Sequence, residues 1–206
     1  MTAIELYGTA TSPYVRRVHA LAIEFGLDCT HVDTASDAGQ ARLRALSPVW
    51  KIPAVVLDGE PLFDSRVIGE ELVRRQAKAG ALGEFAPLDE GFAARNLSTV
   101  IDGALDSLIN VFYLKRDGIS PEAASYLAKQ GARAASAMTW VEAQLDEAGH
   151  WLTPSGRFGL PELNLITTLE WMRFRATYPV DAHPKLAAFV AFHTERPSLV
   201  ATRPPA

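Results

Sequence analysis

The feature that most constrains the fold is a change of hydrophobic period within the first 25 residues. Residues 3–7 alternate from side to side as a half-buried strand does, whereas apolar residues between 15 and 25 recur at steps of three and four, as on one face of a helix. Between them, Ser12 suits an N-cap and Pro13 suits the first helical position. The free N–H groups and the positive end of such a helix favour an anion. A plain helix start is the alternative interpretation.

The rest of the first third continues this alternation of strands and helices. Asp58-Gly59 between two apolar runs is a strong hairpin signal. The order β-α-β-α-β-β-α predicts an α/β domain with a four-stranded mixed sheet. The expected elements are a strand at Cys29–Val32, a brief helix at Ala41–Leu46, hairpin strands at Ile52–Leu57 and Pro61–Phe63, and a helix that begins at Asp64-Ser65.

The second half carries helical patterns only, so we expect a domain at 1–78, a linker at 79–87 and an all-helical domain at 88–206. The residues from 160 to 178 are apolar on most faces, which indicates the central buried helix of that domain. Its other expected helices lie around Leu105–Phe112, from Ser120-Pro121-Glu122 to about Glu147, and at Pro184–Phe192, before a Pro-rich tail.

The composition favours a cytoplasmic enzyme or binding protein. Of 206 residues, 48% are hydrophobic and 21% charged, which is ordinary for a globular protein, and the net charge of −4 offers no footprint for nucleic acid or an anionic membrane. We expect no leader and no apolar run that spans a bilayer. The single cysteine, Cys29, excludes an internal disulfide and a dithiol pair. The five histidines lack metal-ligand spacing, so we expect no metal.

Two further segments suit the binding of a peptide. If the Ile52–Pro53 bond is cis, the backbone N–H and C=O of Ile52 point outward and can pair with an extended peptide. Asp64-Ser65 begins a helix whose N–H groups suit a carboxylate, although ordinary capping explains the same residues. Together with an anion at Ser12, these sites describe one small thiol tripeptide.

Three segments, taken in order and spacing, resemble the glutathione-site motifs of the cytosolic glutathione transferases: Ser12-Pro13-Tyr14-Val15, Ser47-Pro48-Val49-Trp50-Lys51-Ile52-Pro53-Ala54-Val55 and Leu62-Phe63-Asp64-Ser65. The tail, with Arg196-Pro197-Ser198 and Thr202-Arg203-Pro204, is similar to that of bacterial members. The resemblance implies a thioredoxin-like N-terminal domain, an α-helical C-terminal domain, glutathione as co-substrate, a small electrophile as second substrate, and a homodimer.

The resemblance also assigns roles to individual residues. Ser12 takes the place of the catalytic Ser or Cys, with Thr9, Thr11 and Tyr7 as the alternatives for contact with sulfur. For glutathione, Ile52 supplies paired backbone bonds, Pro53 matches the cis-proline, Lys51 lies near the glycyl carboxylate, and Asp64 and Ser65 hold the γ-glutamyl end. The electrophile pocket between the domains would be lined by Tyr7, Tyr14, Phe112, Tyr113 and Arg116, for which helix core is the competing interpretation.

The chain departs from the pattern of the family that it resembles, and these departures narrow the range of expected reactions. Ser-Pro-Tyr-Val is what remains of a glutaredoxin-like Cys-Pro-Tyr-Cys motif after both thiols are lost, so disulfide exchange through protein thiols is removed. At the start of the central helix, Gly159 stands at the N-cap and Glu162 can reach back to a backbone N–H. A glutathione transferase is the leading hypothesis. The alternatives are a non-catalytic binding protein of the same fold and a glutathione-dependent thiol oxidoreductase or peroxidase.

Overall fold

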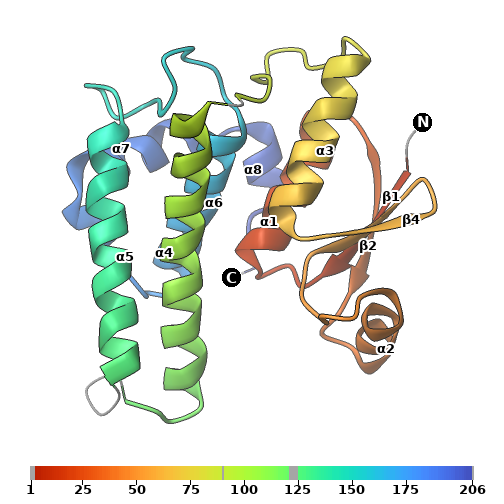
Figure 1. The fold of residues 1–206 in the computed structure, drawn as a ribbon, viewed down its shortest axis with the longest axis horizontal. Helices are drawn as coiled ribbons and strands as arrows, with labels where there is room; N and C mark the ends of the chain where they lie inside the picture. Colours follow the sequence, from red (N-terminus) through yellow and green to blue (C-terminus); the bar gives the residue numbers. More distant parts are fainter. Residues whose placement is uncertain (1–2, 90, 121–124, 206) are drawn as a thin grey trace. The chain divides into compact units, whose positions relative to one another are not determined.

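The computed structural model describes residues 3–89, 91–120 and 125–205, which fall into two compact units (Figure 1). The first unit contains the chain up to Leu88 together with the segment from Thr194 onward, and the second contains Asp89–His193. The predicted boundary assigned residues 88–206 to one helical domain. The last segment instead returns to the first unit, because it packs on that unit's first helix.

The first unit is built on a four-stranded mixed sheet with the strand order β2-β1-β3-β4, which confirms the predicted α/β architecture. Strands β1 and β2 are parallel, whereas β1–β3 and β3–β4 are antiparallel. At the hairpin, Asp58 and Gly59 have φ of 54° and 85°. Two consecutive positive φ values characterise the type I′ turn that Asp-Gly favours. The strands are β1 (Ala3–Gly8), β2 (Asp28–Asp33), β3 (Ala54–Leu57) and β4 (Glu60–Phe63).

Helices cover this sheet on both faces because side chains alternate along β1. Ile4 and Leu6 are buried on one face, while Tyr7 on the other packs with Leu43 of α2. In Figure 1, α1 and α3 run beside each other and α2 lies apart from them. The helices are α1 (Pro13–Glu24), α2 (Asp37–Leu46), α3 (Ser65–Lys78) and the short α8 (Pro197–Ala201).

Helix α8, which the Pro-rich tail did not predict, is held to α1 by buried and partly buried polar contacts. The Arg196 guanidinium donates two hydrogen bonds of 2.7 Å to the carboxylate of Glu24, which also accepts from the Ser198 hydroxyl. Arg16 is 3% exposed and donates to the carbonyl oxygen of Leu199 at 3.0 Å. These contacts join residues more than 170 positions apart in the sequence, and they fix α1 at both of its ends.

The second unit is all-helical, as predicted, and its central helix is α6. That helix ends at Phe174, before the predicted Tyr178, because Ala176 has a φ of 49° and the N–H of Thr177 bonds back to the carbonyl of Met172. The predicted helix opening at Pro121-Glu122 lies outside the described residues. The elements are α4 (Phe92–Arg116), α5 (Ser125–Gln144), α6 (Leu160–Phe174), the 3-10 helix η1 (Val180–Ala182) and α7 (Pro184–His193).

Within the described residues, α4 alone has the length and apolar composition that a membrane-spanning helix requires. A core helix of a soluble protein satisfies the same two criteria. Helix α4 packs on α5 and α6 and carries Asp102 and Asp106 near its middle. The sequence expectation that no segment has this length and composition is therefore qualified at α4.

Candidate functional site

The turn between β1 and α1 brings a hydroxyl to a helix N-terminus. Strand β1 approaches α1 so closely that a Cβ atom on Gly8 would lie 2.2 Å from Cγ2 of Val15, so only glycine fits. Ser12 has extended backbone angles, and its side chain accepts a hydrogen bond of 3.3 Å from the N–H of Val15. It therefore caps α1 as the sequence predicted.

The Ser12 hydroxyl keeps a donor after capping the helix. The cap uses an oxygen lone pair, and among the described residues no acceptor lies within hydrogen-bond distance of its O–H group. The first turn of α1 contains no acidic residue. The partial positive charge of this helix end is therefore not matched by a local carboxylate, and a half-buried O–H group faces the same point. Such an arrangement suits an incoming anion.

The segment that leads into β3 presents free backbone groups. The Ile52–Pro53 peptide bond is cis. The N–H and C=O of Ile52 form no hydrogen bond within the described parts of the chain. Lys51 beside it is exposed and has no carboxylate within ion-pair distance in those same parts. The segment can thus offer one backbone donor, one backbone acceptor and one cation to a ligand.

The start of α3 is held in a strained backbone conformation. Asp64 is the N-cap, with φ of 71° and ψ of 131°, and its carboxylate accepts a 2.8 Å hydrogen bond from the N–H of Arg66. A positive φ outside glycine costs about 1–3 kcal/mol and persists where the surroundings impose it, often at ligand sites. Ser65 is 8% exposed and occupies the first helical position. Asp64 therefore caps α3, and contact of Asp64 and Ser65 with a ligand stays a prediction.

The hydroxyl of Tyr7 is already hydrogen-bonded to side chains of the protein, which argues against its donating to a ligand sulfur. Its hydroxyl donates to the carboxylate of Glu5 and accepts from Arg42 at 3.0 Å. Burial, followed by the hydrogen bond and charge of Glu5, raises the pKa of Tyr7 above its usual value. The phenol is therefore neutral at physiological pH with its proton already committed. It packs in the cluster under α2, and its proposed place in a pocket wall stays a prediction.

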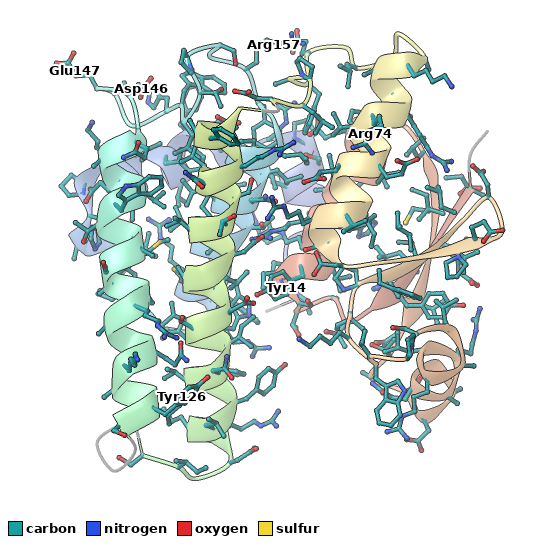
Figure 2. The ribbon with its side chains drawn as sticks, viewed as in Figure 1. Tyr14, Arg74, Tyr126, Asp146, Glu147 and Arg157 are labelled. Carbon is teal, nitrogen blue, oxygen red and sulfur yellow. The ribbon has the colours of Figure 1, made fainter. Side chains whose placement is uncertain are left out.

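The candidate pocket residues of the second unit form one aromatic and cationic cluster. Phe112 and Tyr113 on α4 meet edge to face at 5.3 Å, and Phe112 also meets Trp171 of α6 at 5.8 Å. Arg116 lies over the ring of Tyr113 at 4.8 Å. Tyr14, the remaining candidate, belongs to the first turn of α1 in the first unit (Figure 2), where the Arg17 guanidinium lies 5.2 Å from its ring centroid.

One member of this cluster was missed by sequence reasoning. Arg175 follows the last residue of α6, and its guanidinium carbon lies 5.2 Å from the ring centroid of Phe112 and 4.4 Å from that of Phe174. The only signal in the sequence is a basic residue at a helix C-terminus, a pattern shared by many structural arginines.

The thiol of Cys29 does not join either group of residues. It is half-buried on β2, and burial, with a smaller effect from Asp28, raises its pKa to about 11. A thiol with that pKa carries little thiolate at neutral pH. Across the described ranges, no three His, Cys, Asp or Glu side chains are grouped as a metal site would need.

Comparisons with known proteins agree with the observed fold. Residues 6–80 match the family model of the glutathione S-transferase N-terminal domain. Glutathione S-transferase 3 of Zea mays is 37% identical over 83 residues, which are 39% of this chain and 37% of the maize protein. That match therefore spans little more than a third of the maize protein's length.

Two solved structures are similar over both units. A glutathione S-transferase from Methylobacillus flagellatus, solved with glutathione bound, gives a TM-score of 0.81 at 26% identity, with 100% of both chains covered. A glutathione transferase family member from Pseudomonas fluorescens, also with bound glutathione, gives 0.80 at 27% identity and covers 98% of this chain and 100% of its own. The predicted combination of a thioredoxin-like domain with a helical domain is thereby confirmed.

Proposed function

Because residues 6–80 match the glutathione S-transferase N-terminal domain and both units are similar to solved glutathione transferases, we propose that the chain is a glutathione transferase. It would bind glutathione through its first unit, and the glutathione thiolate would attack a small apolar electrophile to form a thioether. In this proposal Ser12 is the catalytic residue. The observation that supports it most strongly is the hydroxyl at the N-terminus of α1, which caps the helix as an acceptor and still has its O–H group to donate. A thiolate is the anion that this site would stabilise.

The remaining contacts follow from the groups that each segment offers. An extended tripeptide would pair its cysteinyl N–H and C=O with the backbone of Ile52, beside Pro53, as an added strand does. Lys51 would attract the glycyl carboxylate. Asp64 would accept from the γ-glutamyl ammonium group, and Ser65 with the N–H groups of α3 would receive the γ-glutamyl carboxylate.

The energetic contribution of Ser12 is moderate and measurable. A hydrogen bond to a charged group contributes about 1.5–3 kcal/mol, and the end of a helix adds about 0.3–1 kcal/mol. Each 1.36 kcal/mol changes the thiolate-to-thiol ratio about tenfold. A thiol that is a few per cent ionised at neutral pH would become about half ionised or more. Orientation of the second substrate must supply much of the remaining acceleration.

Ser12→Ala tests this assignment. We expect kcat for conjugation of an aryl halide to fall about tenfold or more, because the hydroxyl's hydrogen bond to the thiolate is lost. The dissociation constant of glutathione, measured by calorimetry, should change little. Thr9→Val and Thr11→Val are matched controls that remove the neighbouring hydroxyls and should retain kcat. An unchanged kcat in Ser12→Ala would refute the catalytic role of Ser12. A fall in kcat in Thr9→Val or Thr11→Val would assign the hydrogen bond to the thiolate to that threonine instead.

Two alternatives are distinguished by parallel assays. A non-catalytic relative would be retained on immobilised glutathione without turning over any electrophile. A thiol oxidoreductase or peroxidase would reduce a glutathione mixed disulfide or a peroxide with glutathione as the source of sulfur. The high pKa of Cys29 argues against a role for the protein's own thiol in that chemistry.

The proposed enzyme would act in the cytoplasm as a homodimer and without a metal. Sizing chromatography combined with light scattering measures the oligomeric state directly. Full activity after dialysis against a chelator is the expected result for the metal.

A further inference from the structure

The guanidinium of Arg175 is held in place without being neutralised. Its carbon lies within 5.2 Å of the Phe112 and Phe174 ring centroids, so the cation is flanked by rings from α4 and from the end of α6. Its Nε atom is buried and has no hydrogen-bond partner within the described residues. Aromatic faces attract a cation but supply no strong hydrogen-bond acceptor. The five donors of this side chain are therefore not satisfied by the protein.

The neighbouring arginines differ in this respect. Arg116, which lies over Tyr113 in the same cluster, donates to Asp117 at 3.2 Å. Arg173, two residues before Arg175, forms an ion pair with Asp181. No ion pair to Arg175 exists in the portion of the chain that the structure describes. Arg175 is thus the member of this group whose charge is not balanced by a nearby carboxylate.

Since Nε is closed to solvent, a ligand would meet Arg175 through its two terminal nitrogens, which form a planar fork that matches a carboxylate. The flanking rings would orient that fork and exclude water from one side of the ion pair. The same rings offer an apolar surface to the carbon skeleton that bears the carboxylate.

We propose that Arg175 binds a carboxylate carried by the otherwise apolar skeleton of the second substrate, so that the preferred electrophiles are small aromatic or unsaturated acids. This inference rests on the proposed function and on the expectation from the sequence that Phe112, Tyr113 and Arg116 contact the electrophile. Arg175 would be a specificity-determining residue that acts on the carboxylate and leaves the carbon attacked by sulfur to other groups.

A purely structural role for Arg175 makes a different prediction. A cation at the end of α6 interacts favourably with the negative end of the helix dipole, and its stem packs against Phe174. Loss of that role would lower the stability of the protein and its activity toward all electrophiles alike. Discrimination between an acid and its ester would not change, so this ratio separates the two roles.

The kinetic test compares 4-chloro-3,5-dinitrobenzoate with its methyl ester, from which the glutathione thiolate displaces chloride through the same ring carbon. In Arg175→Gln we expect kcat/KM for the acid to fall about tenfold or more, mainly through KM, while the value for the ester is retained. Arg175→Lys should restore part of the loss because it keeps the charge without the fork. Arg173→Gln, a matched variant of a paired arginine, should leave the acid-to-ester ratio unchanged.

A binding measurement keeps the proposal testable whether or not the protein turns over. The purified glutathione conjugate of each probe is titrated calorimetrically into the wild type, Arg175→Gln and Arg173→Gln, with circular dichroism to verify folding. Tighter binding of the acid conjugate that only Arg175→Gln abolishes would support the inference. An equal preference in the wild type and Arg175→Gln would overturn it. If the protein turns over both probes without preferring the acid, the inference about Arg175 fails and the proposed function stands. If the acid conjugate binds more tightly but neither probe is turned over, the proposed function fails and the inference about Arg175 stands.

Discussion

Helices α1 and α6 both carry a proline in their first turn and differ in the group that meets their free N–H groups. At α1, the neutral hydroxyl of Ser12 accepts one N–H, and no acidic side chain is present in the first turn. At α6, the cap is Gly159, and the carboxylate of Glu162 accepts from its N–H at 3.1 Å. The predicted return of Glu162 to the cap is thereby confirmed.

The two helix ends differ in what they leave for a ligand. Glu162 is fully buried and also accepts from the N–H of Leu152 at 3.2 Å, so α6 has an internal anion that ties a loop to the helix. Helix α1 has a hydroxyl with a donor to spare and no such anion. A helix N-terminus completed by the protein's own carboxylate serves the fold, whereas one that lacks it is suited to an anionic ligand.

The largest expected effect is on stability, at α6. Glu162→Ala removes the acceptor for two buried backbone N–H groups, and each buried donor left unpaired costs about 1–3 kcal/mol. We expect the free energy of unfolding in urea to fall by about 2–4 kcal/mol. Glu162→Gln, which keeps one acceptor oxygen, should lose less. Equal losses in the two variants would show that shape and one acceptor oxygen are not enough, and that both carboxylate oxygens are needed to hold the loop.

Placing a carboxylate at the N-terminus of α1, as α6 has at its own, should change activity without changing stability. Ser12→Asp supplies an N-cap of similar quality and a charge that the helix dipole favours, so the unfolding free energy should stay within about 0.5 kcal/mol of wild type. The carboxylate would repel the thiolate and occupy its place. We expect conjugation activity to fall about a hundredfold, below that of Ser12→Ala.

Ser36 provides the matched control for this substitution. It caps α2 through a 3.1 Å hydrogen bond from the N–H of Gly39, in the same way that Ser12 caps α1. Ser36→Asp should leave both activity and stability near wild type. Activity retained by Ser12→Asp would mean that the anion is held elsewhere, and the contrast between α1 and α6 would lose its functional meaning.

The pH dependence of stability offers a finer comparison. Burial raises the pKa of Glu162 and outweighs the hydrogen bonds it accepts. Its folded pKa therefore exceeds its unfolded pKa, so the stabilisation it contributes is present at low pH and is lost as pH rises through the folded value. The unfolding free energy of wild type minus that of Glu162→Gln should decline from acid toward neutral pH. A difference that rises with pH would reverse the assignment.

Glu24 supplies the opposite sign within the same molecule. Burial alone would raise its pKa, but the hydrogen bonds from Arg196 and Ser198 outweigh burial and hold the pKa below its usual value. Its contribution is present above the unfolded pKa and is lost as pH falls through the folded pKa. Glu24→Gln measured alongside should therefore give a difference from wild type that grows with pH. The stability contributions of the buried Glu162 and the partly buried Glu24 should therefore change with pH in opposite directions.

The sequence predicted features that local patterns determine. The change of period at Ser12, the Asp58-Gly59 turn and the cap at Glu162 all depend on residues within a few positions of each other, and each is present in the structure. The candidate residues Ile52 and Asp64 were chosen from the motifs that the sequence resembles. The structure gives a cis bond after Ile52 and a positive φ at Asp64, and contact of either residue with glutathione stays a prediction.

Other features depend on contacts between distant residues and carry no local signal. Helix α8 is fixed by Glu24 and Arg196, which are 172 positions apart, and a Pro-rich tail gives no sign of such a pairing. The hydroxyl of Tyr7 donates to nearby Glu5 but also accepts from Arg42, 35 positions away, and this second contact has no local signal. That Arg175 has no ion pair among the described residues depends on the positions of carboxylates from several helices, which no local pattern of the sequence reveals.

The smallest expected effect lies at the opposite ends of the same two helices. Helix α1 closes at Gly26, with φ of 60° and the N–H of Leu27 bonded to the carbonyl of Ala22, whereas α6 closes in the same way at Ala176, with φ of 49°. Residues other than glycine adopt this left-handed conformation at a cost of about 1–2 kcal/mol. Glycine avoids that cost, but part of its advantage is offset because its unfolded chain has more conformational entropy to lose. Ala176→Gly should therefore raise the unfolding free energy by about 0.5–1 kcal/mol.

Gly26→Ala is the reciprocal variant and should lower the unfolding free energy by a similar amount, since no atom lies within 4 Å of the added Cβ to complicate the result. Urea midpoints for the two variants measure both effects. Opposite signs of similar size would show that backbone conformation alone sets the difference between these helix ends, in contrast to their N-termini, where it is set by charge. A loss of stability in Ala176→Gly would instead mean that the methyl group of Ala176 makes packing contacts that outweigh its strain.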